Sequence, residues 1–421
     1  MDVIDRDFVT MATVRAWKTE LDPTDAQVAL LRQAAGAARF VWNWGLGERI
    51  RLYREQGEST SAFSQLKQLR ARKAEEFPWL AEASKCVPEY ALRNLDAAFS
   101  HFFRRVKEKR AGKGSGPVGF PRFKARDRCR ETFGVAGETV RVEQRRLRLP
   151  RIGWIRLKER GYLPAEGPDC HLQGVTVSES AGRWYVAVQA QIEQEIEAAT
   201  GPVTGVDLGV SCLATCADGR RFENPRALLI AERRLARAQR ALARCQKGSG
   251  RRERAKFRVA RLHQRVSNVR QDAAHKATAA IVGRGLPADQ RPASIGLETL
   301  NVKGMLSNHH LARALSDAGM GELRRQIGYK AEWCGCEIVA APMFYPSSKT
   351  CSACGEVKDT LGLGERVFRC GACGLVIDRD LGAAINLRNV AAGSAETKNG
   401  HGGAVRPALS ARPDDVSTPR A

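Results

Sequence analysis

Four cysteines near the C-terminal end of the chain have the spacing of metal ligands. Cys351 and Cys354 form one Cys-x-x-Cys pair, and Cys370 and Cys373 form a second. Two residues between thiolates allow both sulfurs to reach one tetrahedral ion at about 2.3 Å. Because four thiolates leave no coordination position open, we expect a structural Zn²⁺ with no catalytic role. A redox dithiol pair is the alternative, which two pairs at this spacing disfavour.

Three acidic residues occur where an isolated carboxylate is costly. Asp207 lies inside the apolar stretch VTGVDLGV, Glu298 ends the apolar stretch SIGLETL, and Asp380 begins the amphipathic stretch DRDLGAAINLRNV. No Lys or Arg lies within two residues of Asp207 or Glu298, so a divalent cation is the natural partner of a charge buried there. Carboxylates that share two Mg²⁺ ions about 4 Å apart hydrolyse phosphodiesters. The alternative is that each acid caps a turn or a strand end.

The charge of the chain indicates a polyanionic partner. It contains 69 Lys and Arg against 46 Asp and Glu, a formal net charge of +23. Such an excess attracts polyanions, of which nucleic acid is the commonest in a cell. A merely basic surface is the alternative.

Two segments carry the candidate nucleic-acid contacts. The Gly- and Pro-rich stretch GKGSGPVGFPRFKARDR sets two phenylalanines among cations, a pattern that suits phosphate neutralisation and base stacking. A basic linker with two anchoring phenylalanines is the alternative. An expected hairpin around residues 141–158 is also dense in arginine. The candidates are Lys113, Phe120, Arg122, Phe123, Lys124, Arg126, Arg145 and Arg146.

The elements that must position these residues follow from hydrophobic periodicity. The N-terminal part predicts one strand in ATVRAWKTEL and then three helical segments up to about residue 112. Short alternating strands over residues 131–194 indicate a small β-barrel or sheet. The Asp207 strands come next, followed by a long Arg-rich helical stretch over 226–283 that is interrupted near KGSG. The Glu298 strand, a helical segment and a further strand precede the cysteines.

The compartment is expected to be a reducing cytoplasm. No run of about 18 apolar residues is present, and the first residues are acidic without an apolar signal core. Met11 is an alternative start. The other cysteines are scattered without a disulfide-like framework.

Three stretches together resemble a known family. GVDLGV, GLETLNVKGM and SSKTCSACG…CGACGLVIDRDLGAAINL are similar to the three split RuvC motifs and the zinc ribbon of the TnpB family. That family comprises transposon-encoded, RNA-guided DNA endonucleases related to the compact effectors of type V CRISPR systems. The resemblance covers nearly the whole chain and is more specific in the C-terminal half. It implies that Asp207, Glu298 and Asp380 are catalytic and hold Mg²⁺, and that the four cysteines hold zinc.

The third acid has a rival. Asp378 lies two residues before Asp380 in the same DRD motif, and we expect Asp378 to be the N-cap of the following helix. The family's metal-binding residue matches the second acid of the motif, which favours Asp380. The family usually reads D-R-D-x-N-A-A, whereas Gly382 replaces the Asn here. A glycine inside a helix costs up to about 1 kcal/mol, so this change can loosen the helix and lower the efficiency of cleavage.

The resemblance implies an α+β multidomain architecture. We expect a β-barrel wedge with an inserted helical recognition module, followed by a ribonuclease-H-like (RuvC) α/β domain with an inserted zinc ribbon. The expected segments are an N-terminal wedge strand (1–18), a helical recognition module (19–127), the β-barrel wedge (128–199), the first part of the RuvC domain (200–344), the zinc ribbon (345–376), the RuvC C-terminal helix (377–392) and a disordered tail (393–421).

The function implied is RNA-guided, Mg²⁺-dependent cleavage of target DNA through a single RuvC site, associated with a transposon. The expected partners are a guide RNA from a non-coding element or array and double-stranded target DNA with a short flanking motif. The main alternative is an RNA-guided DNA-binding protein with weak or no cleavage, either repressor-like or a compact CRISPR effector. A cut-and-paste transposase and a guide-independent structure-specific nuclease are further alternatives.

Overall fold

The computed structural model describes residues 8–113, 116–126, 128–362 and 364–400. These residues form two compact units, which are described separately. One unit contains Thr10–Glu195 and Ala238–Arg261, and the other contains residues 8–9, Ile196–Arg237 and the described residues from Leu262 onward. No helix among the described residues is long and apolar enough to cross a membrane.

The first unit is built around a seven-stranded sheet in the order β2-β6-β7-β1-β5-β4-β3. Its long strands β6 and β7 alternate buried and exposed side chains, as expected for a sheet with one face covered. The strands are β1 (Phe8–Asp22), β2 (Thr132–Ala136), β3 (Arg141–Val142), β4 (Arg146–Leu149), β5 (Gly153–Leu157), β6 (Cys170–Ser180) and β7 (Arg183–Glu197).

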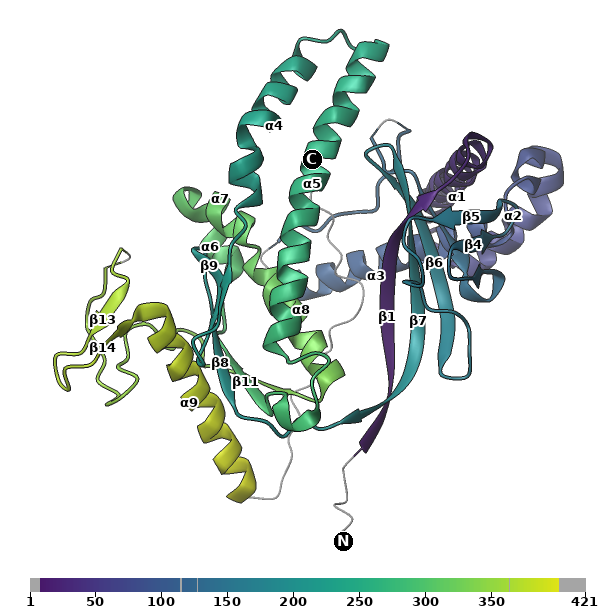
Figure 1. Ribbon diagram of the computed structural model, residues 1–421. Coiled ribbons are helices and arrows are strands. Elements are labelled where there is room, and N and C mark those ends of the chain that lie inside the picture. The colour runs from purple at the N-terminus through teal and green to yellow at the C-terminus, as the bar shows by residue number, and fades with distance from the viewer. Residues whose placement is uncertain (1–7, 114–115, 127, 363, 401–421) are drawn as a thin grey trace. The chain divides into compact units, whose positions relative to one another are not determined.

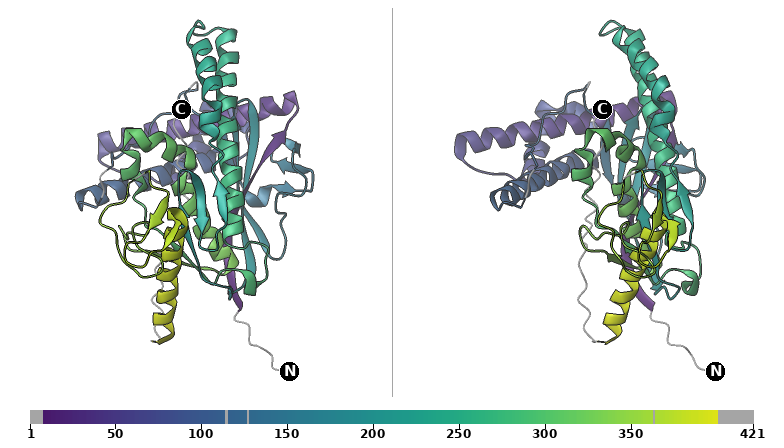
Figure 2. Two further views of the ribbon diagram at one scale, coloured as in Figure 1. Left: turned by 60° about the vertical axis from the view of Figure 1, so that its left-hand side comes forward. Right: turned by 90° about the vertical axis from the view of Figure 1, so that its left-hand side faces the viewer.

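Helices α1 (Asp25–Gln56), α2 (Ala62–Glu76) and α3 (Cys86–Arg110) follow β1 in the chain and share one hydrophobic core with the sheet. Figure 2 shows α1 and α3 running side by side. The Thr24 hydroxyl accepts from the Gln27 amide and the Gln27 side chain accepts from the Thr24 amide, a capping box that starts α1. The expected boundary between strand and helices at residue 18 is therefore wrong, because β1 continues in register with β5 to Asp22.

The Arg-rich stretch is interrupted where the sequence predicted a break. Helix α4 (Ala227–Ala243) and helix α5 (Gly250–Ile281) are separated by a short connection in which Gly248 has a φ of 83°. Arg252 closes the end of α4 by donating from Nη1 to the carbonyl oxygens of Leu242 and Cys245, both at 3.0 Å.

The second unit contains a five-stranded sheet in the order β10-β9-β8-β11-β12. Strands β10, β9 and β8 pair antiparallel, whereas β8, β11 and β12 pair parallel. The strands are β8 (Thr204–Leu208), β9 (Cys212–Cys216), β10 (Arg221–Glu223), β11 (Ser294–Leu297) and β12 (Glu337–Ala340). Three helices lie between β11 and β12 in the chain: α6 (Val302–Leu306), α7 (His309–Ala318) and α8 (Met320–Cys334).

Helix α9 (Arg379–Gly400) crosses β8 and β11 at two glycines (Figure 1). A Cβ on Gly205 would collide with the carbonyl oxygen of Ala384, and one on Gly296 would collide with that of Leu387. The helix backbone therefore rests directly on the sheet. The helix was expected to end at 392, but it continues to Gly400, and no proline within residues 379–400 stops it earlier. The rest of the expected tail, 401–421, lies outside the described residues.

Side chains from the sheet, α5 and α8 share a second hydrophobic core. Lys330 of α8 is almost fully buried in this unit, with 2 % of its surface exposed. Its Nζ donates to the Thr278 hydroxyl at 2.6 Å and to the His275 carbonyl oxygen at 2.8 Å. The gain from these two bonds offsets part of the cost of removing an ammonium group from water.

Candidate functional site

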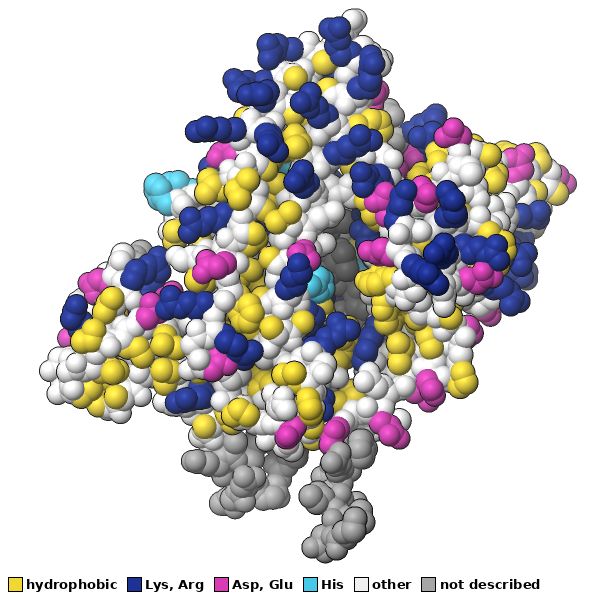
Figure 3. All heavy atoms as spheres, in the orientation of Figure 1, with side chains coloured by type: hydrophobic (Ala, Val, Ile, Leu, Met, Phe, Trp, Pro, Cys, Tyr) yellow, Lys and Arg dark blue, Asp and Glu magenta, His cyan; other side chains and the backbone are white. Residues whose placement is uncertain are grey.

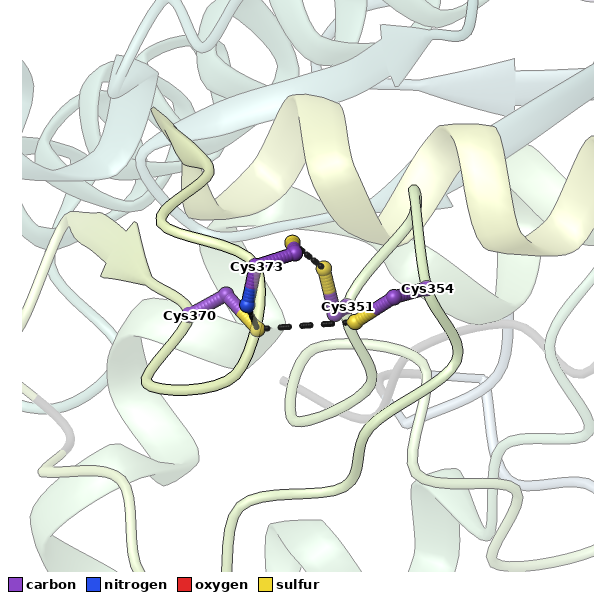
Figure 4. Close-up of side chains that lie close together, drawn as sticks. All are labelled: Cys351, Cys354, Cys370 and Cys373. Carbon is purple, nitrogen blue, oxygen red and sulfur yellow. Dashed lines mark hydrogen bonds between the residues drawn. The ribbon is translucent and has the colours of Figure 1, made fainter.

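The four cysteines converge as the spacing predicted (Figure 4). Their sulfurs all lie within 4.8 Å of one another, and the Cys351–Cys373 and Cys354–Cys370 Sγ pairs are each 3.6 Å apart. A tetrahedral ion bound at about 2.3 Å requires sulfurs about 3.8 Å apart, so the geometry fits Zn²⁺. A hydrogen bond from the backbone amide of Cys373 lowers the pKa of the Cys370 thiol, whereas hydrogen bonds with the neighbouring thiols raise the pKa of Cys354. Thiolates are the form that binds zinc.

The segment that carries the four cysteines, residues 347–376, is called the knuckle below. It continues directly into the third acidic motif. Strands β13 (Val367–Arg369) and β14 (Val376–Asp378) form a hairpin that ends where α9 begins. Asp378 accepts from the Leu381 amide at 3.0 Å and forms an ion pair with Arg221 at 2.7 Å. Asp378 thus acts as the N-cap of α9, as expected, and its Oδ1 already has two partners.

The three acids come from neighbouring elements of one unit. Val206 and Leu297 pair in the parallel ladder of β8 and β11, so the next residues, Asp207 and Glu298, follow at the same edge of the sheet. Asp380 lies in the first turn of α9, the helix that crosses these two strands. The sheet pairing and the crossing helix therefore bring together residues that are far apart in the sequence.

Electrostatics couples the acids. The pKa of Asp207 is raised to about 8, first by loss of hydration and then by the charges of Glu298 and Asp380, against a smaller opposing effect of Arg379. A cation at this point would restore the ionised form. Within the described part of the chain, only the cysteines bring three or more ligand atoms within 4.8 Å of one another. The three carboxylates are therefore more widely spaced than the ligands of a single ion.

Three polar residues hold Glu298 and α9 at this edge. The buried Ser347 hydroxyl donates to Glu298 Oε1, and the Arg324 guanidinium donates to the Glu298 carbonyl oxygen at 2.8 Å. The buried Asn386 of α9 donates to the carbonyl oxygens of Ser347 and Thr350, both at 2.8 Å. These bonds join the start of the knuckle to both the second acid and the helix of the third.

Arg366 is a site residue that sequence reasoning missed. It lies between the two cysteine pairs, and its guanidinium donates to the Ser211 hydroxyl at 3.1 Å and approaches Asp380 Oδ2 at 3.9 Å. Arg379 lies 3.4 Å from the other oxygen of Asp380. The only signal in the sequence is a cation inside the ribbon, which says nothing about its distance to Asp380. The knuckle thus delivers a positive charge to the acidic site.

The Gly- and Pro-rich basic stretch that contains Phe120 and Phe123 is called the basic loop below. In the first unit it is anchored on α1. Trp42 Nε1 donates to the Arg122 carbonyl oxygen at 3.0 Å, and the Asn43 side chain bonds both the amide and the carbonyl of Lys124. Phe120 packs edge-on against Phe99 at 5.5 Å between ring centroids. Phe120 is therefore partly an anchor, although 45 % of it stays exposed.

The predicted nucleic-acid contacts differ in availability. Lys124 Nζ lies 3.7 Å from the centre of the Trp42 ring, and burial lowers its pKa, so this ammonium faces an indole. Arg146 is paired with Glu143 at 2.6 Å and lies over Trp154. The other predicted contacts have exposed side chains; they are Lys113, Arg122, Phe123, Arg126 and Arg145.

The longest array of cations follows α4 and α5. Figure 3 shows Lys and Arg side chains distributed along these helices. The exposed arginines include Arg233, Arg234, Arg237, Arg240, Arg244, Arg251, Arg254, Arg258, Arg261 and Arg265. Charge of one sign at this density repels itself, which a phosphate backbone would relieve.

Three family models match successive parts of the chain. Residues 175–309 match the OrfB_IS605 model, described as "Probable transposase", and residues 321–387 match "Cas12f1-like, TNB domain". Residues 11–58 match a "Helix-turn-helix domain" of the same OrfB_IS605 group. In the structure that last span is strand β1 followed by the single helix α1.

Curated relatives match over nearly their full length. A "Putative RNA-guided DNA endonuclease" of Streptomyces pristinaespiralis is 34 % identical over 93 % of this chain and 92 % of its own. The "Putative RNA-guided DNA endonuclease InsQ" of Escherichia coli K12 is 31 % identical over 91 % of this chain and 94 % of its own. Among solved structures, a Cas12f1–sgRNA–target DNA complex matches with a TM-score of 0.52 at 13 % identity. It covers 90 % of this chain and 99 % of that one, which indicates a shared mixed α/β fold.

Proposed function

The chain belongs to the TnpB (OrfB_IS605) family of RNA-guided DNA endonucleases, and from that premise we propose that it cleaves target DNA at a single Mg²⁺-dependent RuvC site. The observation that carries this proposal is the parallel pairing of β8 with β11, which brings Asp207 and Glu298 to one end of the sheet under the helix that bears Asp380. The raised pKa of Asp207, caused by burial and then by the charges of Glu298 and Asp380, agrees with that arrangement. Acids that repel one another in this way are arranged for a cation.

The topology of the second unit supports a ribonuclease-H-like assignment. Three antiparallel strands are followed by two parallel strands that are added on the β8 side, and a C-terminal helix crosses the sheet. In the first unit we assign the seven-stranded sheet to a β-barrel wedge and α1–α3 to a helical recognition module. The chain order supports that assignment, because the three helices separate β1 from β2 while β1 lies between β7 and β5 in the sheet.

Asp207, Glu298 and Asp380 would hold two Mg²⁺ ions. Bound there, the ions supply an activated water and stabilise the leaving oxygen. Ser347 orients Glu298 by donating to its carboxylate. Arg366 is positioned to contact a phosphate beside Asp380, with its guanidinium held by Ser211. Zinc in the knuckle would fix the hairpin that carries Arg366 and ends at the N-cap of α9.

The nucleic acids would be held by charge and shape. We assign the arginines of α4 and α5 and the exposed part of the basic loop to the backbone of a guide RNA and its heteroduplex with target DNA. Base pairing would read the sequence, and the protein would read a short flanking motif in the DNA duplex. The guide would come from a non-coding element or array, and the protein would act with a transposon in the prokaryotic cytoplasm.

The test is cleavage by the full chain purified with the RNA that binds it in its host. Sequencing that RNA gives the guide, and DNA matched to the guide is then incubated with the complex and Mg²⁺. Cleavage that requires both the matching sequence and Mg²⁺ supports the proposal, and Asp207→Asn is the control. The absence of a discrete bound RNA would contradict the guided mechanism.

Gly382 favours a second candidate, an RNA-guided DNA-binding protein with weak or no cleavage. It replaces a side chain in the first turns of α9, just after Asp380. Stable retention of matched but intact DNA under the same conditions would select this candidate.

A further inference from the structure

One exposed aromatic residue occupies a strained backbone position beside the acidic site. Phe344 has a φ of 66°, in the left-handed region that bulky residues avoid, and 86 % of it is exposed. Among the described residues it is the one aromatic side chain with a positive φ. The strained backbone would be more stable with another residue, and the exposed ring adds nothing to a hydrophobic core. Stability of the fold therefore does not explain a phenylalanine at this position.

The strain has a defined local origin. The amide of Tyr345 donates to the carbonyl oxygen of Pro342 at 3.1 Å, which closes a four-residue turn with Phe344 in its third position. A positive φ at that position is the type II geometry, which favours glycine. Glycine would therefore build this turn at lower energy than phenylalanine does.

The turn is fixed to the edge of the sheet that carries Glu298. The Ala341 amide donates to the Leu297 carbonyl oxygen at 2.8 Å, and the Thr299 hydroxyl donates to the Ala341 carbonyl oxygen at 2.7 Å. Leu297 and Thr299 flank Glu298 in the chain. On the other side of the turn, Ser347 bonds the Glu298 carboxylate. Phe344 thus projects from a turn held at both ends to the second acid.

We propose that Phe344 stacks on a nucleobase of the single DNA strand that enters the acidic site and so positions the phosphodiester for cleavage. An unpaired strand offers the face of every base, and stacking on an aromatic ring is tolerant of sequence. A surface ring that a rigid turn holds in place loses little conformational freedom on binding. This inference rests on the proposed function and makes Phe344 a substrate-positioning residue.

The experiment uses the full chain with its copurified RNA and the substitution Asp207→Asn, which keeps the DNA intact. The probe is a short single-stranded oligothymidylate that carries one 2-aminopurine, whose fluorescence falls when it stacks. Phe344→Gly removes the ring and also relieves the turn, so melting temperature separates folding from binding. Phe344→Trp restores an aromatic ring. Met343→Ala is the matched control, because Met343 lies in the same turn and is also exposed.

We expect Phe344→Gly to melt at the same temperature as the parent or higher, to bind the probe about 5- to 100-fold more weakly and to lose the quenching. Phe344→Trp restores both properties, and Met343→Ala changes neither. Parental affinity and quenching in Phe344→Gly would overturn the inference. An equal loss of probe affinity in Met343→Ala would also overturn it. So would a Phe344→Gly variant that loses its bound RNA but still binds the DNA probe.

Failure of this inference and failure of the proposed function are distinguishable. Cleavage of matched DNA is measured in parallel with chains that retain Asp207. If Phe344→Gly weakens probe binding but the wild-type chain does not cut, cleavage is rejected and the stacking of a DNA strand on Phe344 stands. If the wild-type chain cuts and Phe344→Gly both binds and cuts equally well, only the role of Phe344 is rejected.

Discussion

Gly205 and Gly296 lie side by side in the parallel strands β8 and β11, and the backbone of α9 crosses both of them. The crossing is possible only because neither residue has a Cβ. The consequence is functional, since Asp207 follows two residues after the first glycine and Glu298 two residues after the second. The same contact that seats α9 on the sheet therefore sets the distance of Asp380 from both strand acids.

Gly205→Ala should destabilise the protein and lower cleavage. The new methyl group would collide with the carbonyl oxygen of Ala384, which can move only if α9 lifts from the sheet. Overpacking of this kind costs about 1–3 kcal/mol. Urea unfolding measures the loss. The matched control is Gly328→Ala in α8, where nothing lies within 4 Å of the added Cβ, and which should be neutral or stabilising. Equal stability of the two variants would contradict the close crossing of α9.

Arg366→Ala should lower cleavage and leave bound zinc unchanged. The guanidinium lies 3.9 Å from Asp380 but is no ligand of the cysteine cluster. Loss of a positioned charge beside the reacting phosphate costs on the order of 100-fold in rate. Single-turnover cleavage and the zinc content of the purified protein provide the two measurements. Arg369→Ala, in the same hairpin and also exposed, is the control and should cut normally. An equal loss in both variants would indicate a general charge effect.

Lys330 should make stability depend on pH in the alkaline range. Burial lowers its pKa from 10.5 to about 8. Between about pH 8 and 10.5 the unfolded chain binds more protons than the folded chain, so the free energy of unfolding rises with pH. Below pH 8 the penalty is fully present, on the order of 3 kcal/mol. Urea unfolding of wild type and Lys330→Met across this range provides the test. A stability difference between them that does not change with pH would contradict the shift.

Gly382→Asn should stabilise α9 and raise the cleavage rate. Asparagine loses less conformational freedom than glycine in a helix, and an added Cβ at this position would meet the Ile377 side chain at 3.4 Å, an ordinary contact. We expect a gain of about 0.3 kcal/mol in the free energy of unfolding, because asparagine is itself only a moderate helix former. Gly393→Ala, farther along the same helix and with open space around it, is the control for helix stability without an effect on rate. Urea unfolding and single-turnover cleavage provide the two measurements. A lower free energy of unfolding, or a slower cleavage, in Gly382→Asn would show that the glycine is required there.

The sequence predicted features whose causes are local. The two residues between Cys351 and Cys354 allow both sulfurs to bind one ion, which predicts the cysteine cluster. The apolar neighbours of Asp207 predict a buried carboxylate that needs a partner. The break between α4 and α5 was likewise predictable from glycine. Side-chain directions across the fold were not. Lys124 lies over Trp42, and Arg366 approaches Asp380, because distant segments pack together, and neither contact leaves a signal in the neighbouring residues.

The central claim is that Asp207, Glu298 and Asp380 form one site, and single-turnover cleavage by neutralised variants tests it most directly. We predict that Asp207→Asn, Glu298→Gln and Asp380→Asn each abolish cutting while the complex still binds matched DNA. Any double variant should be no slower than a single one, because the residues act as a unit. Asp378→Asn should weaken the cap of α9 yet retain cutting. Full cleavage activity in Asp207→Asn, Glu298→Gln or Asp380→Asn would contradict the account. Loss of cleavage in Asp378→Asn would contradict it as well.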